Sequence, residues 1–210
     1  KDDSASKSTA HVAAPADQSA VTHGSVTVGG KTINYTATAG VLILKNKDEK
    51  PIASMSYVAY TKDGANPTSR PITFLYNGGP GSSTIWLHML AFGPKRVVVG
   101  SGTLTPSAPY QFVNNNDSLL DASDLVFIDA PGTGFGRVIG KDEGGAGTGK
   151  DVYGVDEDAH AFAQFITRYI TINSRWNSPK FLFGESYGTT RSAVLANILE
   201  NDDNVGLNGV

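Results

Sequence analysis

A serine that could act as a covalent nucleophile lies at the centre of the pentapeptide GESYG, residues 184–188. An apolar run, 180–183, precedes this pentapeptide, and a helix-favouring segment, 189–200, follows it. A serine on a sharp strand-to-helix turn exposes its hydroxyl above the sheet, and the flanking glycines leave room for the strained backbone. The helix N-terminus directs its dipole and free N–H groups towards a developing oxyanion. The pattern predicts that Ser186 is a nucleophile; the alternative is a tight turn that merely contains a serine.

A second segment, NGGPGSS at 77–83, has residues suited to stabilising an oxyanion. It follows the apolar run PITFLY. Consecutive glycines let backbone N–H groups approach a reacting carbonyl without obstruction by a Cβ atom. An ordinary turn also favours Gly and Pro, so the chemistry alone leaves both interpretations open.

The acid and the base that would activate this serine are not found in the expected order. In α/β hydrolases the acid and then the histidine follow the nucleophile along the chain. Asp202 and Asp203 follow Ser186 by only 16 and 17 residues, and all four histidines precede it: His11, His23, His88 and His160. A serine without a general base is a weak nucleophile. We therefore expect the catalytic Asp and His on a C-terminal segment or second chain of the same precursor.

The final segment, 205–210, has the apolar spacing of a strand that is just beginning. A domain that ended there would leave a strand edge and an apolar face uncovered. We expect the downstream segment to pack against this one through a large apolar interface. Residues 1–210 alone should then be insoluble or inactive.

The elements that must position these residues change in character along the chain. Residues 25–40 alternate around Gly29-Gly30, as in a two-residue hairpin, and 41–61 add two more strands. Continuous apolar runs near 71–76 and 124–128 are typical of strands buried on both faces. Hairpins followed by alternating strands and helices predict an α/β fold with a sheet of mixed direction.

Helices are expected at three places in this α/β fold. One lies near 84–92, between the two buried strands. The second, within 152–169, has one apolar stripe, and the third, 191–200, follows the serine. We divide the chain into a flexible N-terminal segment, 1–21, and the N-terminal, nucleophile-bearing half of a hydrolase domain, 22–210.

The composition excludes several functional classes. Hydrophobic residues make up 40% of the chain and charged residues 18%, as in globular proteins, and cysteine is absent. A net charge of -3 gives no electrostatic reason to expect nucleic acid or an anionic membrane as partner. The acidic residues 156–158 open a helix, where negative charge is stabilising, so we expect no metal and no cofactor.

The opening segment, 1–21, is small, polar and charged, and it lacks the apolar core of a signal peptide. It resembles the start of a mature exported protein after signal-peptide removal, which predicts a secreted or periplasmic location. A flexible cytosolic tail is the alternative.

Three motifs together resemble the serine carboxypeptidases of the α/β-hydrolase fold. They are NGGPGSS at 77–83, DAPGTGFG at 129–136 and FGESYGT at 183–189. The resemblance extends from about Pro71 to Leu199. The preceding strands and the stretch AFGPKRV are more similar to the bacterial branch than to the disulfide-rich plant and fungal branch.

The resemblance implies release of C-terminal amino acids from peptides through an acyl-enzyme on Ser186. It also implies that the backbone N–H groups of Gly79 and Tyr187 form the oxyanion hole. The residues implied to bind the free carboxylate of the peptide substrate are Asn77, Gly78 and Glu185. An ionised Glu185 would repel that carboxylate, whereas a protonated one can donate a hydrogen bond to it, so activity is expected at acid pH.

Three positions depart from the family pattern. Ala91 stands where many members have a second glutamate, and Leu75 stands where they have a tryptophan. Ser82 replaces a cysteine after the glycines. The first two changes affect carboxylate recognition rather than the hydrolytic serine. Because no complete triad in the expected order lies within this sequence, two other functions stay open: an acyltransferase or esterase of the same fold, and a non-catalytic fragment or binding module.

Overall fold

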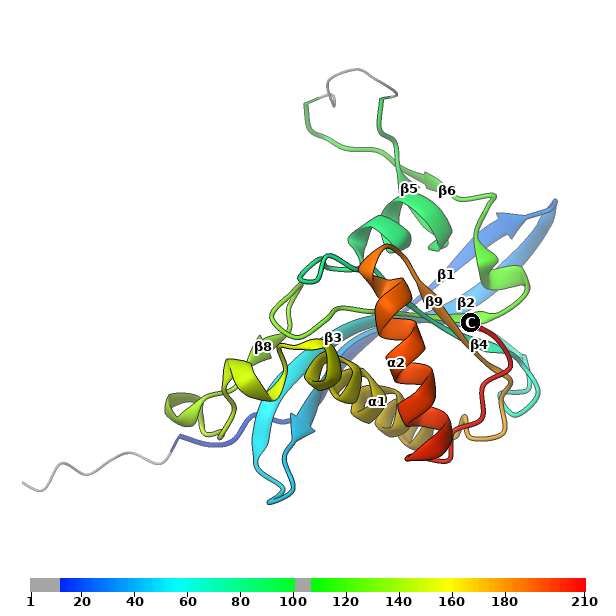
Figure 1. Ribbon diagram of the computed structural model, residues 1–210. Coiled ribbons are helices and arrows are strands. Elements are labelled where there is room, and N and C mark those ends of the chain that lie inside the picture. The colour runs from blue at the N-terminus through cyan, green and yellow to red at the C-terminus, as the bar shows by residue number, and fades with distance from the viewer. Residues whose placement is uncertain (1–11, 101–106) are drawn as a thin grey trace, which may run out of the picture.

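The main sheet contains both antiparallel and parallel strands (Figure 1). The computed structural model describes residues 12–100 and 107–210. Within them, seven strands form a sheet in the order β1-β2-β3-β7-β4-β9, with β8 paired to β3. The strands of this sheet are β1 (Gln18–Val28), β2 (Lys31–Lys45), β3 (Pro51–Lys62), β4 (Ile72–Tyr76), β7 (Asp124–Ile128), β8 (Arg137–Val138) and β9 (Lys180–Gly184). The predicted α/β fold with N-terminal antiparallel hairpins is confirmed.

The first three strands form an antiparallel meander. Gly29 and Gly30 both have positive φ, at 54° and 76°, which a two-residue hairpin turn requires. We predicted a break near Gly40, but β2 continues through it. The ring of Tyr57 lies within 2.7 Å of where a Cβ on Gly40 would be, so this glycine accommodates a ring and does not end the strand.

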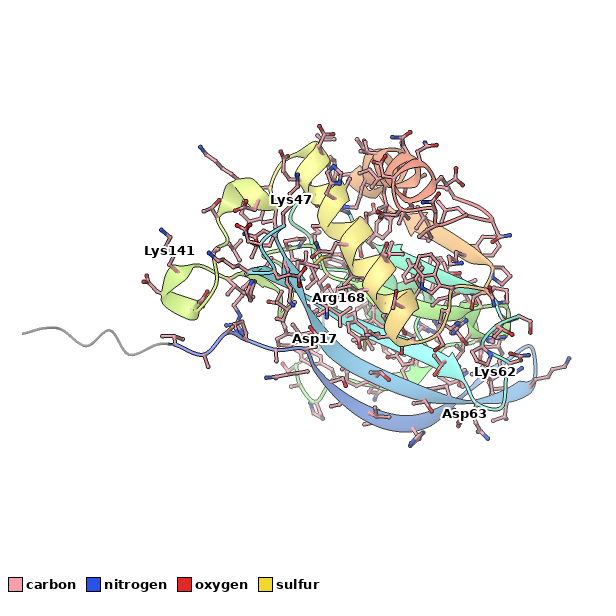
Figure 2. The ribbon with its side chains drawn as sticks, turned by 90° about the horizontal axis from the view of Figure 1, so that it is seen from below. Asp17, Lys47, Lys62, Asp63, Lys141 and Arg168 are labelled. Atoms are coloured by element: carbon pink, nitrogen blue, oxygen red, sulfur yellow. The ribbon has the colours of Figure 1, made fainter. Side chains whose placement is uncertain are left out.

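The N-terminal segment is attached to the sheet from Asp17 onwards. Asp17 accepts hydrogen bonds from the N–H of Ile43 at 2.8 Å and from Arg168 at 2.5 Å, and Figure 2 shows Asp17 beside Arg168. Strand β1 then begins at Gln18, four residues before the predicted start of the structured region. Pairing with β2 explains this difference. The rest of the predicted flexible segment, 1–11, lies outside the described residues.

Strands β7, β4 and β9 are parallel neighbours in the sheet. Strand β4 pairs in parallel with β7 on one side and with β9 on the other. Every residue of β4 and β7 is buried, as their continuous apolar sequences predicted. The carboxyl ends of β4 and β9 therefore lie next to each other at one edge of the sheet, where ligands bind in open α/β sheets.

Helices cover both faces of this sheet. The long helices α1 (Val155–Ile172) and α2 (Tyr187–Asn201) pack with Phe74 on one face (Figure 1). Leu75 points to the other face, where it packs with the π-helix η1 (Leu87–Phe92). All three helices were predicted. None of the helices in the described ranges is long and apolar enough to cross a membrane.

The remaining elements are short. A separate two-stranded sheet pairs β5 (Lys95–Val97) with β6 (Phe112–Asn114). The short 3-10 helices are η2 (Leu119–Asp121), η3 (Lys141–Glu143) and η4 (Gly149–Asp151).

Candidate active site

The nucleophile turn has the strained geometry that its sequence predicts. Ser186 is the N-cap of α2, directly after β9, with φ 58° and ψ -122°, and it is exposed. Non-glycine residues rarely occupy positive φ, and such strain is concentrated at functional sites. The glycines on either side allow the tight turn: a Cβ on Gly184 would lie 2.6 Å from Ser192 Oγ, and one on Gly188 would lie 3.1 Å from Tyr76 O.

The glycine segment after β4 packs directly against this turn. A Cβ on Gly78 would lie 2.7 Å from both Glu185 O and Gly188 N, closer than real Cβ atoms approach such atoms. The Glu185 N–H also donates to Tyr76 O at 3.2 Å. The fold therefore brings together the two motifs that the sequence singled out, through backbone contacts that only glycine permits.

Asn77 is buried between the two motifs and forms four hydrogen bonds. Its backbone N–H donates to Thr84 Oγ1 at 3.2 Å, and its Oδ1 accepts from the N–H of Leu87 at 3.1 Å. Its Nδ2 donates to Glu185 Oε2 at 2.9 Å, and its carbonyl accepts from Arg191 Nη1 at 2.9 Å. Because the Leu87 N–H fixes which amide atom is the oxygen, Nδ2 must face Glu185.

The two N–H groups predicted to form an oxyanion hole belong to the residues that follow Gly78 and Ser186. Gly79 has φ 108° and follows Gly78, while Tyr187 is the first residue of α2. Neither N–H has an acceptor in the described part of the chain, whereas the next one, on Gly188, donates to Glu185 O at 2.8 Å. Unengaged N–H groups beside a serine hydroxyl can stabilise a developing negative charge.

The histidines of the described residues have other environments. His23 contacts Thr36 at 3.1 Å, and His88 Nε2 contacts the Tyr60 hydroxyl at 2.7 Å. Burial lowers the pKa of His88 to about 4. His160 lines a pocket between α1 and α2 together with Asp202 and Asp203. His11 lies outside the described residues.

The acidic residues after the nucleophile are also distant from it. Ser186 and Asp202 cap the two ends of helix α2, 16 positions apart, so about 24 Å separates them. Asp203 accepts a hydrogen bond from Thr167 of α1 at 3.3 Å. In the described ranges, the hydroxyl of Ser186 has no hydrogen-bond partner, and no three acidic or histidine side chains gather as a metal site.

Two charged residues beneath the site were given no catalytic role by the sequence. Arg191 of α2 and Asp158 of α1 form a buried ion pair at 2.6 Å. We had explained Asp158 by its place at a helix start. Both residues lie on the apolar faces of their helices, beside Phe162 and Leu195, and that unusual position is the signal that could have identified them.

A mixed sheet with a strained serine between a parallel strand and a helix defines an α/β-hydrolase fold. The glycine segment beside that serine comes from the loop after the neighbouring strand, where this fold builds its oxyanion hole. Comparison with known families assigns the chain more closely. It belongs to the serine carboxypeptidase family, whose model matches residues 30–209.

Individual relatives agree with this family. The pheromone-processing carboxypeptidase KEX1 of Saccharomyces cerevisiae is 28% identical over 170 residues, which cover 78% of this chain and 22% of the relative. Serine carboxypeptidase S10 family member 1 of Dictyostelium discoideum is 27% identical over 156 residues, covering 73% of this chain and 33% of the relative. The chain thus spans between a fifth and a third of the length of these two relatives.

A solved structure was also matched. The peroxisomal alpha-beta-hydrolase Lpx1 of Saccharomyces cerevisiae gives a TM-score of 0.44 at 12% identity, covering 89% of this chain and 42% of that one.

Proposed function

We propose that this chain carries the nucleophile of a serine carboxypeptidase that releases C-terminal amino acids from peptides. The observation that carries the proposal is the contact between Asn77 and Glu185, 2.9 Å apart, beside the exposed Ser186. It places a hydrogen-bond donor and a carboxyl group next to the nucleophile. A free terminal carboxylate could be bound there while the preceding peptide bond lies at the serine.

The reaction would proceed through an acyl-enzyme. Ser186 Oγ attacks the carbonyl of the last peptide bond, and the N–H groups of Gly79 and Tyr187 stabilise the negative charge on its oxygen. A histidine accepts the serine proton and donates it to the departing amine, which releases the terminal amino acid. Water, activated by the same histidine, then hydrolyses the ester and restores the serine.

Recognition of the terminal carboxylate would depend on Asn77, Gly78 and Glu185. Asn77 Nδ2 donates one hydrogen to Glu185, which leaves the other hydrogen for the substrate. The backbone of Gly78 packs against the backbone of Glu185. Glu185 must be protonated to donate a hydrogen bond to a carboxylate. We therefore propose that the enzyme works best at acid pH.

The catalytic Asp and His would come from a C-terminal segment or second chain of the same precursor. In support of this proposal, no described histidine contacts Ser186. Strand β9 lies at one edge of the sheet, and on its outer side Phe181 forms a parallel bridge to Gly209. Phe183 on the same strand is exposed, so further strands could extend the sheet there and bury it. A secreted or periplasmic location rests on the composition of residues 1–21.

Labelling of the intact protein with a fluorophosphonate would test the nucleophile. We expect one label, located on Ser186 by mass spectrometry, and release of amino acids from blocked dipeptides. Ser186→Ala should fold normally, lose the label and lose about 10⁶ in rate. Hydrolysis of simple esters without peptide cleavage would favour the esterase or acyltransferase, and a native protein that takes up no label would favour a non-catalytic binding module.

A further inference from the structure

A fully buried arginine lies directly beneath the candidate site. The side chain of Arg191 is 0% exposed, and that of its partner Asp158 is 10% exposed. The guanidinium donates from Nε at 2.6 Å and from Nη2 at 3.0 Å to the two carboxylate oxygens of Asp158. This bidentate geometry fixes the plane of the guanidinium.

The third nitrogen of this guanidinium reaches the site itself. Nη1 of Arg191 donates to the backbone carbonyl of Asn77 at 2.9 Å. The guanidinium also lies 4.4 Å from the ring centroid of Phe162 and 5.3 Å from that of Tyr187. Arg191 therefore contacts the end of β4, helix α1 and the nucleophile turn together.

Stability alone does not account for a charge in this position. A cation in the first turns of a helix opposes the helix dipole. A buried ion pair also loses solvation, and replacing it with apolar residues of similar size is often neutral or stabilising. The specific consequence of Arg191 is geometric, because it fixes Asn77, and hence Nδ2 beside Glu185, relative to the turn that holds Ser186.

We propose that Arg191, oriented by Asp158, is a positioning residue for recognition of the substrate's terminal carboxylate. The inference rests on the proposed carboxypeptidase function. Without this guanidinium, the carbonyl of Asn77 loses its donor and the amide can shift relative to Ser186. A displacement of about 1 Å in a catalytic arrangement can cost about 100-fold in rate. The loss should be specific to substrates whose free carboxylate reaches Asn77.

The chain contains a matched control at the opposite end of β4. Arg175 is also buried, pairs with Asp124 at 2.7 Å and donates to the backbone carbonyl of Arg70 at 2.9 Å, just before β4 begins. Removing Arg175 leaves Asp124 paired with Arg70 at 2.7 Å. Arg175→Met and the double variant Asp158→Leu/Arg191→Met thus each remove one buried guanidinium without leaving an unpaired carboxylate.

The test compares a blocked dipeptide with its amide as substrates of the complete enzyme. For the double variant we expect KM for the free acid to rise and kcat/KM to fall about 100-fold, with a change of less than about fivefold for the amide. The isosteric variant Asp158→Asn should shift the acid-to-amide ratio in the same direction but less. Arg175→Met should leave the ratio unchanged.

The other possible results would overturn either this inference or the proposed function. An unchanged ratio in folded Asp158 and Arg191 variants would overturn the inference, as would an equal change in Arg175→Met. Loss of folding in both Asp158 variants, with Arg175→Met folded, would assign the pair a structural role and also overturn it. A wild-type enzyme that cleaves neither substrate would instead refute the proposed function.

Discussion

Glu185 combines two features that decide how the site can recognise a substrate. It is exposed at the turn, and Asn77 holds one of its carboxyl oxygens at 2.9 Å. The other oxygen accepts no hydrogen bond within the described part of the chain and can face a ligand. At the residue scale, therefore, the proposed selectivity for a free carboxylate would depend on whether this carboxyl carries a proton.

Replacing Glu185 with glutamine tests this dependence on protonation. Glutamine donates a hydrogen bond at any pH, whereas glutamate donates only when protonated. As pH rises from acid to neutral, kcat/KM of the wild type for a free-acid peptide should fall, and Glu185→Gln should flatten that fall. Glu200→Gln, at the far end of α2, is the control and should keep the wild-type profile. An unchanged profile in Glu185→Gln would remove this carboxyl from substrate recognition.

His88 should make the stability of the protein sensitive to acid. Burial lowers the pKa of His88 from 6.5 to about 4 in the folded state. Between these values the unfolded chain takes up a proton that the folded chain does not, so stability is complete above pH 6.5 and falls as pH drops towards 4. His88→Gln should flatten this slope in urea-unfolding midpoints, while the exposed His23→Gln should not. Equal slopes in both variants would contradict the assignment.

The sequence could identify the site residues that lie within short motifs. Ser186 and the glycines of both motifs stand at fixed spacing beside strands and helices that are evident locally. Arg191 and Asp158 lie far apart in the chain, and their pairing depends on how α1 packs against α2. Only their position on the apolar helical faces suggests a buried partner.

At the scale of elements, the site depends on close packing between the loop after β4 and the start of α2. The backbone of Gly78 occupies space that a side chain would need, against Glu185 and Gly188. The candidate oxyanion donors belong to these two segments, so their spacing follows from this contact. A change in that spacing should affect catalysis more than folding.

Gly78→Ala tests this contact directly. The added methyl group would push the loop away from the nucleophile turn, and we expect kcat/KM to fall at least about 100-fold. Gly206→Ala is a matched control, because a Cβ there meets nothing within 4 Å and its φ is not positive. Thermal unfolding should show that both variants are folded. Wild-type activity in Gly78→Ala would contradict the packing of the two motifs.

The boundaries of several elements could not be predicted from the local sequence. The alternating residues before and after Gly40 predicted two strands, but long pairing with β3 keeps β2 continuous. The strands β5 and β6 are only three residues each and are defined by pairing with each other, which local pattern does not reveal. The glycine-rich segment 140–151 has the local sequence of a flexible loop, yet Ala146 N–H donates to Pro51 O at 2.8 Å. In each case a long-range contact decides the outcome.

At the scale of the whole molecule, the residues that the structure describes include a candidate nucleophile and a candidate binding arrangement, and no described histidine is in contact with that nucleophile. A sheet of mixed direction with strands buried on both faces was predicted from the hairpins and apolar runs, whereas the order of its strands was not. That the general base lies on another segment could be inferred only from the order in which the catalytic residues follow one another along the chain in this fold. We therefore propose that activity requires this segment and a second one acting together.

Reconstitution of the enzyme from two segments tests whether both are required for activity. Three preparations would be made: residues 1–210 alone, residues 1–210 with the downstream segment, and the Ser186→Ala form of residues 1–210 with the downstream segment. Each would be assayed for amino acid release from a blocked dipeptide at acid pH. We expect release only when both wild-type segments are present, with both in one particle. Release by residues 1–210 alone, or by the Ser186→Ala combination, would contradict it.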